Sequence, residues 1–194
     1  MKRSIDVKVA SSQDWVDTVL ADFPSFLRDH ADCERKASGM ASSFVAKYPD
    51  RVDIIPDLID IAIEEMEHFK QVYDVMAAQG ISLNHEIQKD VYVNRLMKLA
   101  RDGREERFLD KLLLASVLEC RGAERFKLIA DALEDVELKR FYKALWTSEA
   151  KHGHVFVAFA LVYFDETQVY KRLEELMTEE ANIIQQIPVR AALH

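Results

Sequence analysis

The sequence predicts an all-α protein in which four long helices form a bundle. Only 5 Gly and 4 Pro occur among 194 residues, so few residues are present that would interrupt a helix. Hydrophobic residues make up 49% and charged residues 31% of the chain, as in an ordinary globular domain. We therefore expect a single domain over residues 1–194.

The first part of the chain predicts a short helix followed by two long ones. The stretch "SSQDWVDTVLADF", residues 11–23, begins with serines that can cap a helix and ends before Pro24. A long helix is expected over residues 24–47, where "YPD" ends it. The next long helix is expected over residues 53–79, because Gly80 is a typical C-terminal stop.

The remainder of the chain predicts two more long helices and two shorter ones. After the connector "ISLNHEIQKD", the stretch "VYVNRLMKLARDG" predicts a short helix over residues 91–103. Long helices are expected over residues 104–133 and 136–164, and a last helix over residues 166–186 stops at Pro188. The whole pattern is a four-helix bundle with extra helices at both termini and in the middle crossover.

One position on the second long helix breaks its apolar face. Residues three and four apart share a face of a helix, and on this face Glu65 is surrounded by apolar residues, with His68 one turn away. Glu64 and Glu67 belong to the polar face and are expected to face water. A carboxylate buried without a partner costs several kcal/mol, so something should compensate Glu65. Its apolar neighbours are Leu58, Ala62, Phe69, Val72 and Met76.

The same anomaly occurs on the other three long helices. Glu149 and His152 repeat the Glu-x-x-His pattern on the fourth, while Glu34 and Glu119 each interrupt an apolar stripe on the first and third. Glu34 precedes Glu65 by 31 residues, and Glu119 precedes Glu149 by 30. Each half of the chain therefore carries one Glu and one Glu-x-x-His.

This set of residues resembles the ligands of ferritin-like carboxylate proteins, in which four Glu and two His hold two metal ions. Carboxylate oxygens can bridge two ions, and one imidazole per ion favours iron or manganese over calcium. The alternative is a bundle whose carboxylates are neutralised by buried cations, but these stripes show no inward Lys or Arg. The predicted metal ligands are Glu34, Glu65, His68, Glu119, Glu149 and His152.

Two further residues could contribute to the site. Glu124 is the best substitute for Glu119, although it could instead pair with a cation of its own helix. His30 precedes Glu34 by one turn and could support that ligand or simply pack in the core. The remaining candidates are expected at the surface or as packed thiols, and they are His154, Cys33 and Cys120.

Four segments of the sequence are similar to the tRNA hydroxylase family MiaE. They are "HADCERKASGMA" around Glu34, "EEMEHFKQV" around Glu65, "LECRGAERFKLIA" around Glu119 and "SEAKHGHVF" around Glu149, and the resemblance runs from about Trp15 into the last helix. It implies a non-haem di-iron monooxygenase that hydroxylates the isopentenyl chain of 2-methylthio-N6-isopentenyladenosine, a modified purine beside the tRNA anticodon. It also implies that the six predicted ligands hold two iron ions, and that O2 and an external electron donor take part.

A ferritin-like di-iron bundle also suits an iron oxidase or peroxidase acting in iron or peroxide handling, which is the alternative function. Rubrerythrins usually carry a second iron module with four cysteines, and this chain has only 2 Cys. Radical-generating reductase subunits are normally much longer than this chain. The resemblance therefore favours the hydroxylase.

The formal net charge of −8 is in tension with a tRNA substrate, because nucleic-acid binding depends on Lys and Arg. We expect a local basic rim to resolve this tension, although a solvated helix face is the alternative for each residue. An electron-transfer protein or reductase is a second expected partner, since no flavin or nicotinamide motif is present. No signal peptide or membrane span is expected, so the predicted location is the cytoplasm, and the sequence leaves monomer and dimer open. The predicted tRNA contacts are Arg35, Lys36, Arg101 and Arg104.

Overall fold

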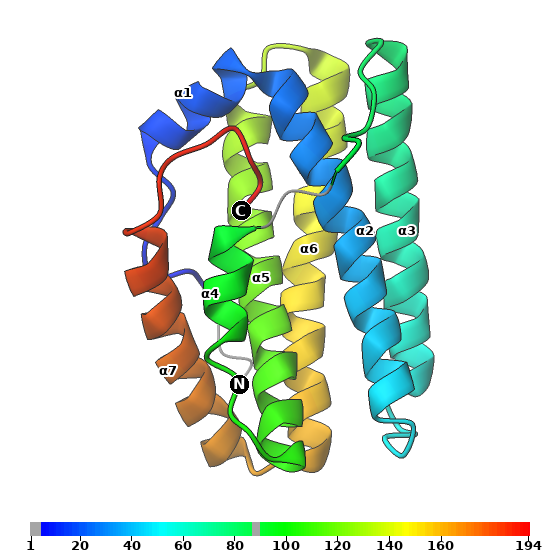
Figure 1. Ribbon diagram of the computed structural model, residues 1–194, viewed down its shortest axis with the longest axis vertical. Helices are drawn as coiled ribbons and strands as arrows, with labels where there is room; N and C mark the ends of the chain where they lie inside the picture. The colour runs from blue at the N-terminus through cyan, green and yellow to red at the C-terminus, as the bar shows by residue number, and fades with distance from the viewer. Residues whose placement is uncertain (1–4, 87–89) are drawn as a thin grey trace. The chain divides into compact units, whose positions relative to one another are not determined.

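Every regular element that the computed structural model describes is an α-helix, within residues 5–86 and 90–194 (Figure 1). The predicted all-α class is therefore confirmed. In the same residues, no helix is both long and apolar enough to cross a membrane. The predicted connector over residues 81–90 includes residues 87–89, which lie outside the described part. The helices are α1 (Gln13–Ala21), α2 (Phe23–Lys47), α3 (Ile55–Ala78), α4 (Val91–Met97), α5 (Arg104–Ala132), α6 (Val136–Tyr163) and α7 (Glu166–Ile184).

Aspartates fix the start of four of these helices. The carboxylate of Asp22 accepts the backbone N–H of Ser25 at the start of α2, and Asp90 does the same for Val93 in α4. Asp135 and Asp165 each accept two N–H groups of the first turns of α6 and α7. Such N-caps satisfy backbone donors that have no partner within the helix, so these starts are set by local sequence.

Helix α4 is shorter than the sequence predicts: it ends at Met97 and does not reach Gly103. The carboxylate of Asp110 accepts the backbone N–H of Arg101 at 2.8 Å and its guanidinium at 2.8 and 2.9 Å. The Arg101 N–H is therefore directed to a side chain of α5 instead of a helical carbonyl. Gly103 has φ +74, a left-handed conformation that turns the chain into α5.

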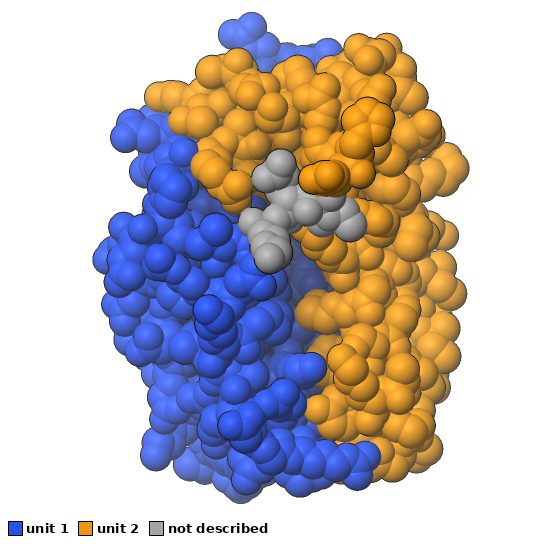
Figure 2. Space-filling model, viewed as in Figure 1, with its two compact units in different colours: residues 1–16, 89–189, 194 blue, residues 17–88, 190–193 orange. Residues whose placement is uncertain are grey.

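The chain divides into two compact units, which are coloured separately in Figure 2. Unit 1 comprises residues 1–16, 89–189 and 194, and unit 2 comprises residues 17–88 and 190–193. In unit 2, α2 and α3 pack side by side as an antiparallel pair (Figure 1). In unit 1, α5 and α6 form the main pair, and α4 and α7 pack against it. A single domain over residues 1–194 stays a prediction.

Each unit has an apolar core that polar residues interrupt at a few positions. In unit 2, this core is made from both long helices and includes Phe26, Leu27, Phe44, Leu58, Val72 and Met76. In unit 1, it includes Phe108, Leu112, Phe126, Ile129, Tyr142, Leu145 and Phe156. The buried polar residues among them include the six predicted ligands, which are described next.

Candidate metal centre

Unit 2 brings together three of the predicted ligands, Glu34 from α2 and both Glu65 and His68 from α3. Each offers one ligand atom, and these atoms lie within 4.8 Å of one another. His68 Nδ1 is 3.3 Å from Glu65 Oε2 and 3.8 Å from Glu34 Oε2. All three side chains are buried, with exposed fractions of 3% for Glu34, 1% for Glu65 and 6% for His68.

Unit 1 repeats this arrangement with Glu119 from α5 and with Glu149 and His152 from α6. Their ligand atoms also lie within 4.8 Å of one another, and all three side chains are buried. His152 Nδ1 is 3.5 Å from Glu149 Oε2, which matches the corresponding pair in unit 2. The match has a local cause, because residues three apart on a helix project from the same face.

The chemistry of each cluster fits a transition-metal ion. Two carboxylates and one imidazole are the donors that iron and manganese accept, and the carboxylates supply the negative charge that a divalent ion needs. A cation also compensates the cost of burying two carboxylates. Each unit therefore holds one buried cluster of Glu and His that is compatible with an iron ion.

His30 distinguishes the cluster of unit 2 from that of unit 1. Its side chain is fully buried, and its Nε2 lies 2.6 Å from Glu34 Oε1, within hydrogen-bonding distance. His30 therefore contacts Glu34, as expected if it supports that residue. The residue four positions before Glu119 is Ala115, which has no polar side chain to offer. The two clusters therefore differ in what holds the lone glutamate in place.

The other residues that the sequence suggested for the site lie outside the two clusters. The carboxylate of Glu124 accepts hydrogen bonds from Ser11 N, Ser11 Oγ and Arg121 Nη1, so it holds the N-terminal segment instead of substituting for Glu119. Glu67 and His154 are exposed, as expected. Both thiols are half-buried instead of fully packed, and burial raises the pKa of Cys120 to about 12. Cys120 is therefore a neutral thiol at physiological pH.

The four predicted tRNA contacts are all exposed, and two lie in each unit. Arg35 and Lys36 follow Glu34 on α2, and Arg35 pairs with Asp32 at 3.0 Å. Arg104 begins α5. Arg101 has a structural role that the sequence does not reveal, because its guanidinium binds the buried carboxylate of Asp110. Reversing the charge of Arg101 would therefore disturb the fold as well as any tRNA contact.

Asp110 is held by two arginines in unit 1. Arg172 also donates to it, through Nε at 2.9 Å and Nη2 at 3.0 Å. Burial acts to raise the pKa of Asp110, but the hydrogen bonds from Arg101 and Arg172 outweigh it and hold this pKa below its ordinary value. The ionised form of Asp110 is thus favoured by folding.

We expect Asp110→Asn to lower the free energy of unfolding at neutral pH by about 1–3 kcal/mol, because both guanidinium groups lose their anion. A lowered pKa stabilises the fold above the unfolded value, about 3.9, and this stabilisation is lost as the pH falls through the folded value. The difference between wild type and variant should therefore shrink at acid pH, where Asp110 itself becomes neutral. Urea denaturation at neutral and acid pH measures it, and an equal difference at both would contradict the expectation.

Sequence reasoning missed a buried ion pair between α5 and α7 of unit 1. Arg121 and Glu180 are both fully buried, and Arg121 Nη2 lies 2.8 Å from Glu180 Oε1. Tyr92 donates to the same carboxylate oxygen at 2.9 Å. Arg121 lies about 200° around α5 from Glu119, so this network occupies a different face of the helix from the predicted ligand. The sequence did contain a signal for this pair, because Glu180 interrupts an apolar stripe of α7 in the same way that the predicted ligands interrupt theirs.

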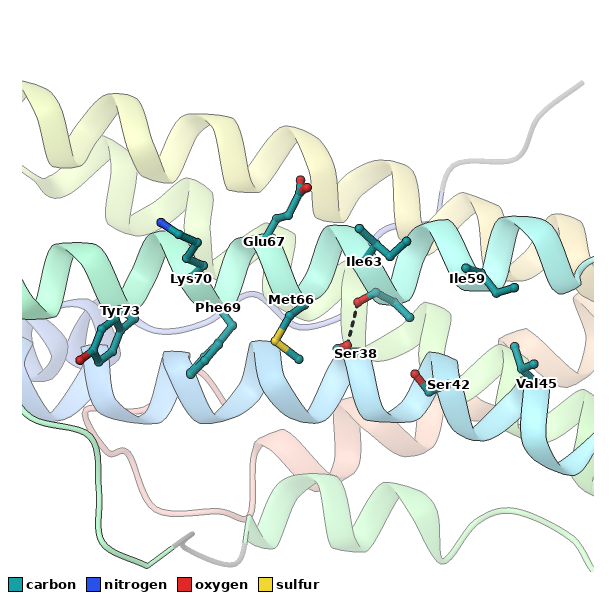
Figure 3. Close-up of a pocket in the computed structure, with 11 residues that line it drawn as sticks. Ser38, Ser42, Val45, Ile59, Ile63, Met66, Glu67, Phe69, Lys70 and Tyr73 are labelled. Carbon is teal, nitrogen blue, oxygen red and sulfur yellow. Dashed lines mark hydrogen bonds between the residues drawn. The ribbon is translucent and has the colours of Figure 1, made fainter.

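Unit 2 also carries an apolar groove of about 730 Å³ between α2 and α3 (Figure 3). Across it the two helices are joined where Ser38 Oγ donates to the carbonyl of Ala62 at 2.7 Å. Met66 follows Glu65 and is therefore turned by about 100° from it, whereas Ala62 and Phe69, which also line the groove, lie on the same face of α3 as Glu65. Of the larger apolar residues on its α3 side, Phe69 is half-buried and four are exposed, namely Ile59, Ile63, Met66 and Tyr73.

Comparisons with known proteins place this chain in a family. Residues 3–194 match the model of a family described as tRNA-(MS[2]IO[6]A)-hydroxylase (MiaE). A Pseudomonas putida protein named tRNA 2-(methylsulfanyl)-N(6)-isopentenyladenosine(37) hydroxylase is 33% identical over 171 residues, which is 88% of this chain and 82% of that protein. A Salmonella typhimurium protein of the same name is 33% identical over 107 residues, which is 55% of this chain but only 39% of that protein.

A solved structure supports the fold in the same way. Protein 43 from Synechococcus, described as having aldehyde deformylating oxygenase activity, is 30% identical and superposes with a TM-score of 0.92. The match covers 100% of this chain and 96% of that chain. The predicted ferritin-like fold is confirmed.

Proposed function

Because this chain belongs to the MiaE family of tRNA hydroxylases, we propose that it hydroxylates the isopentenyl group of 2-methylthio-N6-isopentenyladenosine in tRNA. The observation that carries the proposal is the family match over residues 3–194, which includes all six predicted ligands. The iron oxidase or peroxidase alternative is not favoured, because the relatives are named for hydroxylase and oxygenase activities.

The two clusters supply six ligands for two iron ions, three from each unit. If held by these residues, two iron ions would supply the O2 chemistry that hydroxylation needs, in which one oxygen atom enters a C–H bond and the other leaves as water, with two electrons and two protons from an external donor. The four glutamates provide the negative charge that balances the two ions. Burial of all six side chains keeps bulk water away from them. The external donor is an electron-transfer protein or reductase.

The distribution of charge between the units bears on the approach of tRNA. Unit 2 holds 14 acidic and 7 basic residues, whereas unit 1 holds 20 acidic and 19 basic residues. The net charge of −8 therefore resides almost entirely in unit 2. Unit 1 also contains a cationic stretch that runs from α4 into the first turn of α5, with Arg95, Lys98, Arg101, Arg104 and Arg107. This stretch is the part of the predicted rim on which tRNA phosphates meet the least repulsion.

We expect Arg104→Glu to weaken tRNA binding and to reduce the salt dependence of the affinity by about one unit of logarithmic slope, because one phosphate contact is lost. Arg104 is a better choice than Arg101, which holds Asp110 in the fold. Fluorescence anisotropy with labelled tRNA at several salt concentrations measures both quantities. The matched control is Lys171→Glu, the same charge change at an exposed position of unit 1. Equal affinities and slopes for both variants would remove Arg104 from the interface.

The hydroxylation itself is tested with the wild-type chain. Purified protein is loaded with ferrous iron and supplied with a chemical reductant, O2 and tRNA that bears the methylthio-isopentenyl purine. The tRNA is then digested and its nucleosides are analysed by mass spectrometry. The proposal predicts a gain of one oxygen atom on that purine, dependent on both iron and O2. Consumption of O2 without this product would instead favour the oxidase alternative.

A further inference from the structure

Helices α5 and α6 are in close contact at Gly153, beside the cluster of unit 1. A Cβ at this position would lie 2.7 Å from Cys120 Sγ, closer than side-chain carbons are found in proteins. It would also lie 3.5 Å from the carbonyl oxygen of Ser116, which is ordinary van der Waals contact. The absence of a side chain at Gly153 is therefore what lets the Cys120 thiol occupy its place against α6.

A hydrogen bond ties the same two helices at the same level. Ser116 Oγ donates to the carbonyl oxygen of Gly153 at 2.7 Å, and both residues are buried. Ser116 lies one turn before Cys120 on α5, so both side chains meet α6 at a single residue. The spacing of the two helices at this level is thus set by one steric contact and one polar contact.

This contact adjoins predicted ligands on both helices. Gly153 directly follows His152, and Cys120 directly follows Glu119. Glu119 belongs to α5, whereas Glu149 and His152 belong to α6, so the separation of the two helices decides whether the three can share one ion. In unit 2 the residue after His68 is Phe69, so a glycine contact of this kind beside the ligands occurs only in the cluster of unit 1.

We propose that Gly153 is a positioning residue whose missing side chain sets the α5–α6 spacing at which Glu119, Glu149 and His152 bind one metal ion. The inference rests on the proposed di-iron function and deepens it. To restore ordinary contact at 3.4 Å from the present 2.7 Å, a Cβ would have to displace the thiol by about 0.7 Å. Metal–ligand distances tolerate only about 0.2 Å, so a shift passed on to the backbone would disrupt the cluster.

We expect Gly153→Ala to lower the iron content from about two ions to about one per chain, because only the cluster of unit 1 is disturbed. Its hydroxylation rate should fall by about 100-fold, the usual effect of a misplacement near 1 Å. Iron is measured by elemental analysis and Mössbauer spectroscopy, and thermal unfolding is measured on metal-free protein. A purely structural role would lower the unfolding temperature without removing iron selectively from one site.

Two companion variants make the test specific. In Cys120→Ala/Gly153→Ala the thiol is gone, so the second iron ion should return. Gly122→Ala is the matched control, because it lies on α5 two residues from Cys120 and its added Cβ would meet nothing within 4 Å. This control should keep the wild-type iron content.

Three outcomes decide the question. Wild-type iron content in Gly153→Ala would show that the thiol rotates away without effect and would overturn the proposal. Iron loss that the double variant does not recover would also overturn it, because the thiol contact would not be the cause. Iron loss with recovery supports it. Failure of the proposed function is distinguished beforehand, since the wild-type chain would then bind no iron or would leave the modified purine unchanged.

Discussion

We expect Glu65→Gln to abolish tRNA hydroxylation and to reduce iron binding by at least about 10-fold, which is the low end of the effect of disturbing even the residues around metal ligands. The substitution keeps the shape of the side chain but replaces an anionic oxygen with a neutral amide. Glu65 is only 1% exposed, so the lost charge cannot be replaced by solvent. Elemental analysis and mass spectrometry of the tRNA nucleosides measure the two effects.

The same variant should have the opposite effect on the metal-free protein. A buried carboxylate costs free energy when no ion compensates it, so Glu65→Gln should leave the apo-protein as stable as wild type or more stable. The matched control is Glu67→Gln, the same change at an exposed position two residues away on α3. A control that lost as much iron as Glu65→Gln would count against the assignment of the ligand.

We expect Arg121→Met to lower the free energy of unfolding by about 3–5 kcal/mol, because it leaves the Glu180 carboxylate buried without its cation. The arginine also donates to Val9 O at 2.8 Å and to Glu124 Oε2 at 3.0 Å, so the N-terminal segment loses its attachment to α5. Burial acts to lower the pKa of Arg121, but Glu180, Tyr92 and Glu124 together raise it above its ordinary value, so the charged pair is favoured by folding. Urea denaturation followed by circular dichroism measures the loss.

An exposed ion pair in the same unit provides the control for this substitution. Arg140 Nη1 lies 3.2 Å from Glu137 Oε1 on the surface of α6, and such pairs contribute about 0–1 kcal/mol. Arg140→Met should therefore have little effect. The double variant Arg121→Met/Glu180→Leu should recover much of the lost stability, because an apolar pair of similar volume needs no desolvation. Equal losses for Arg121→Met and Arg140→Met would show that burial does not govern the pair.

The predicted ligands illustrate how much of a site local sequence can encode. Glu65 and His68 are three residues apart, so any helix places them on one face, and the surrounding apolar residues indicate which face is buried. Glu149 and His152 repeat this geometry for the same reason. His30 could also be suspected, because it lies one turn before Glu34. Each of these inferences needs only the period of the helix.

The residues that sequence reasoning missed depend on partners far along the chain. Asp110 binds Arg172, 62 residues later, and Arg121 binds Glu180, 59 residues later. These pairings cannot be read from helical period, because any of several cations could satisfy a given carboxylate. The early end of α4 has the same origin, since Asp110 of α5 captures the backbone N–H of Arg101.

The sequence by itself determined the helices, apart from the end of α4, and the two Glu-x-x-His motifs, because hydrogen bonds within a helix join residues only a few positions apart. The tertiary structure alone decided which carboxylates receive a buried arginine and how closely α5 approaches α6 at Gly153. Packing brings together side chains that are far apart in the sequence, at separations that helical periodicity does not predict. The close contact of a glycine with a thiol on another helix also depends on tenths of an ångström. Those distances arise only when the core is assembled.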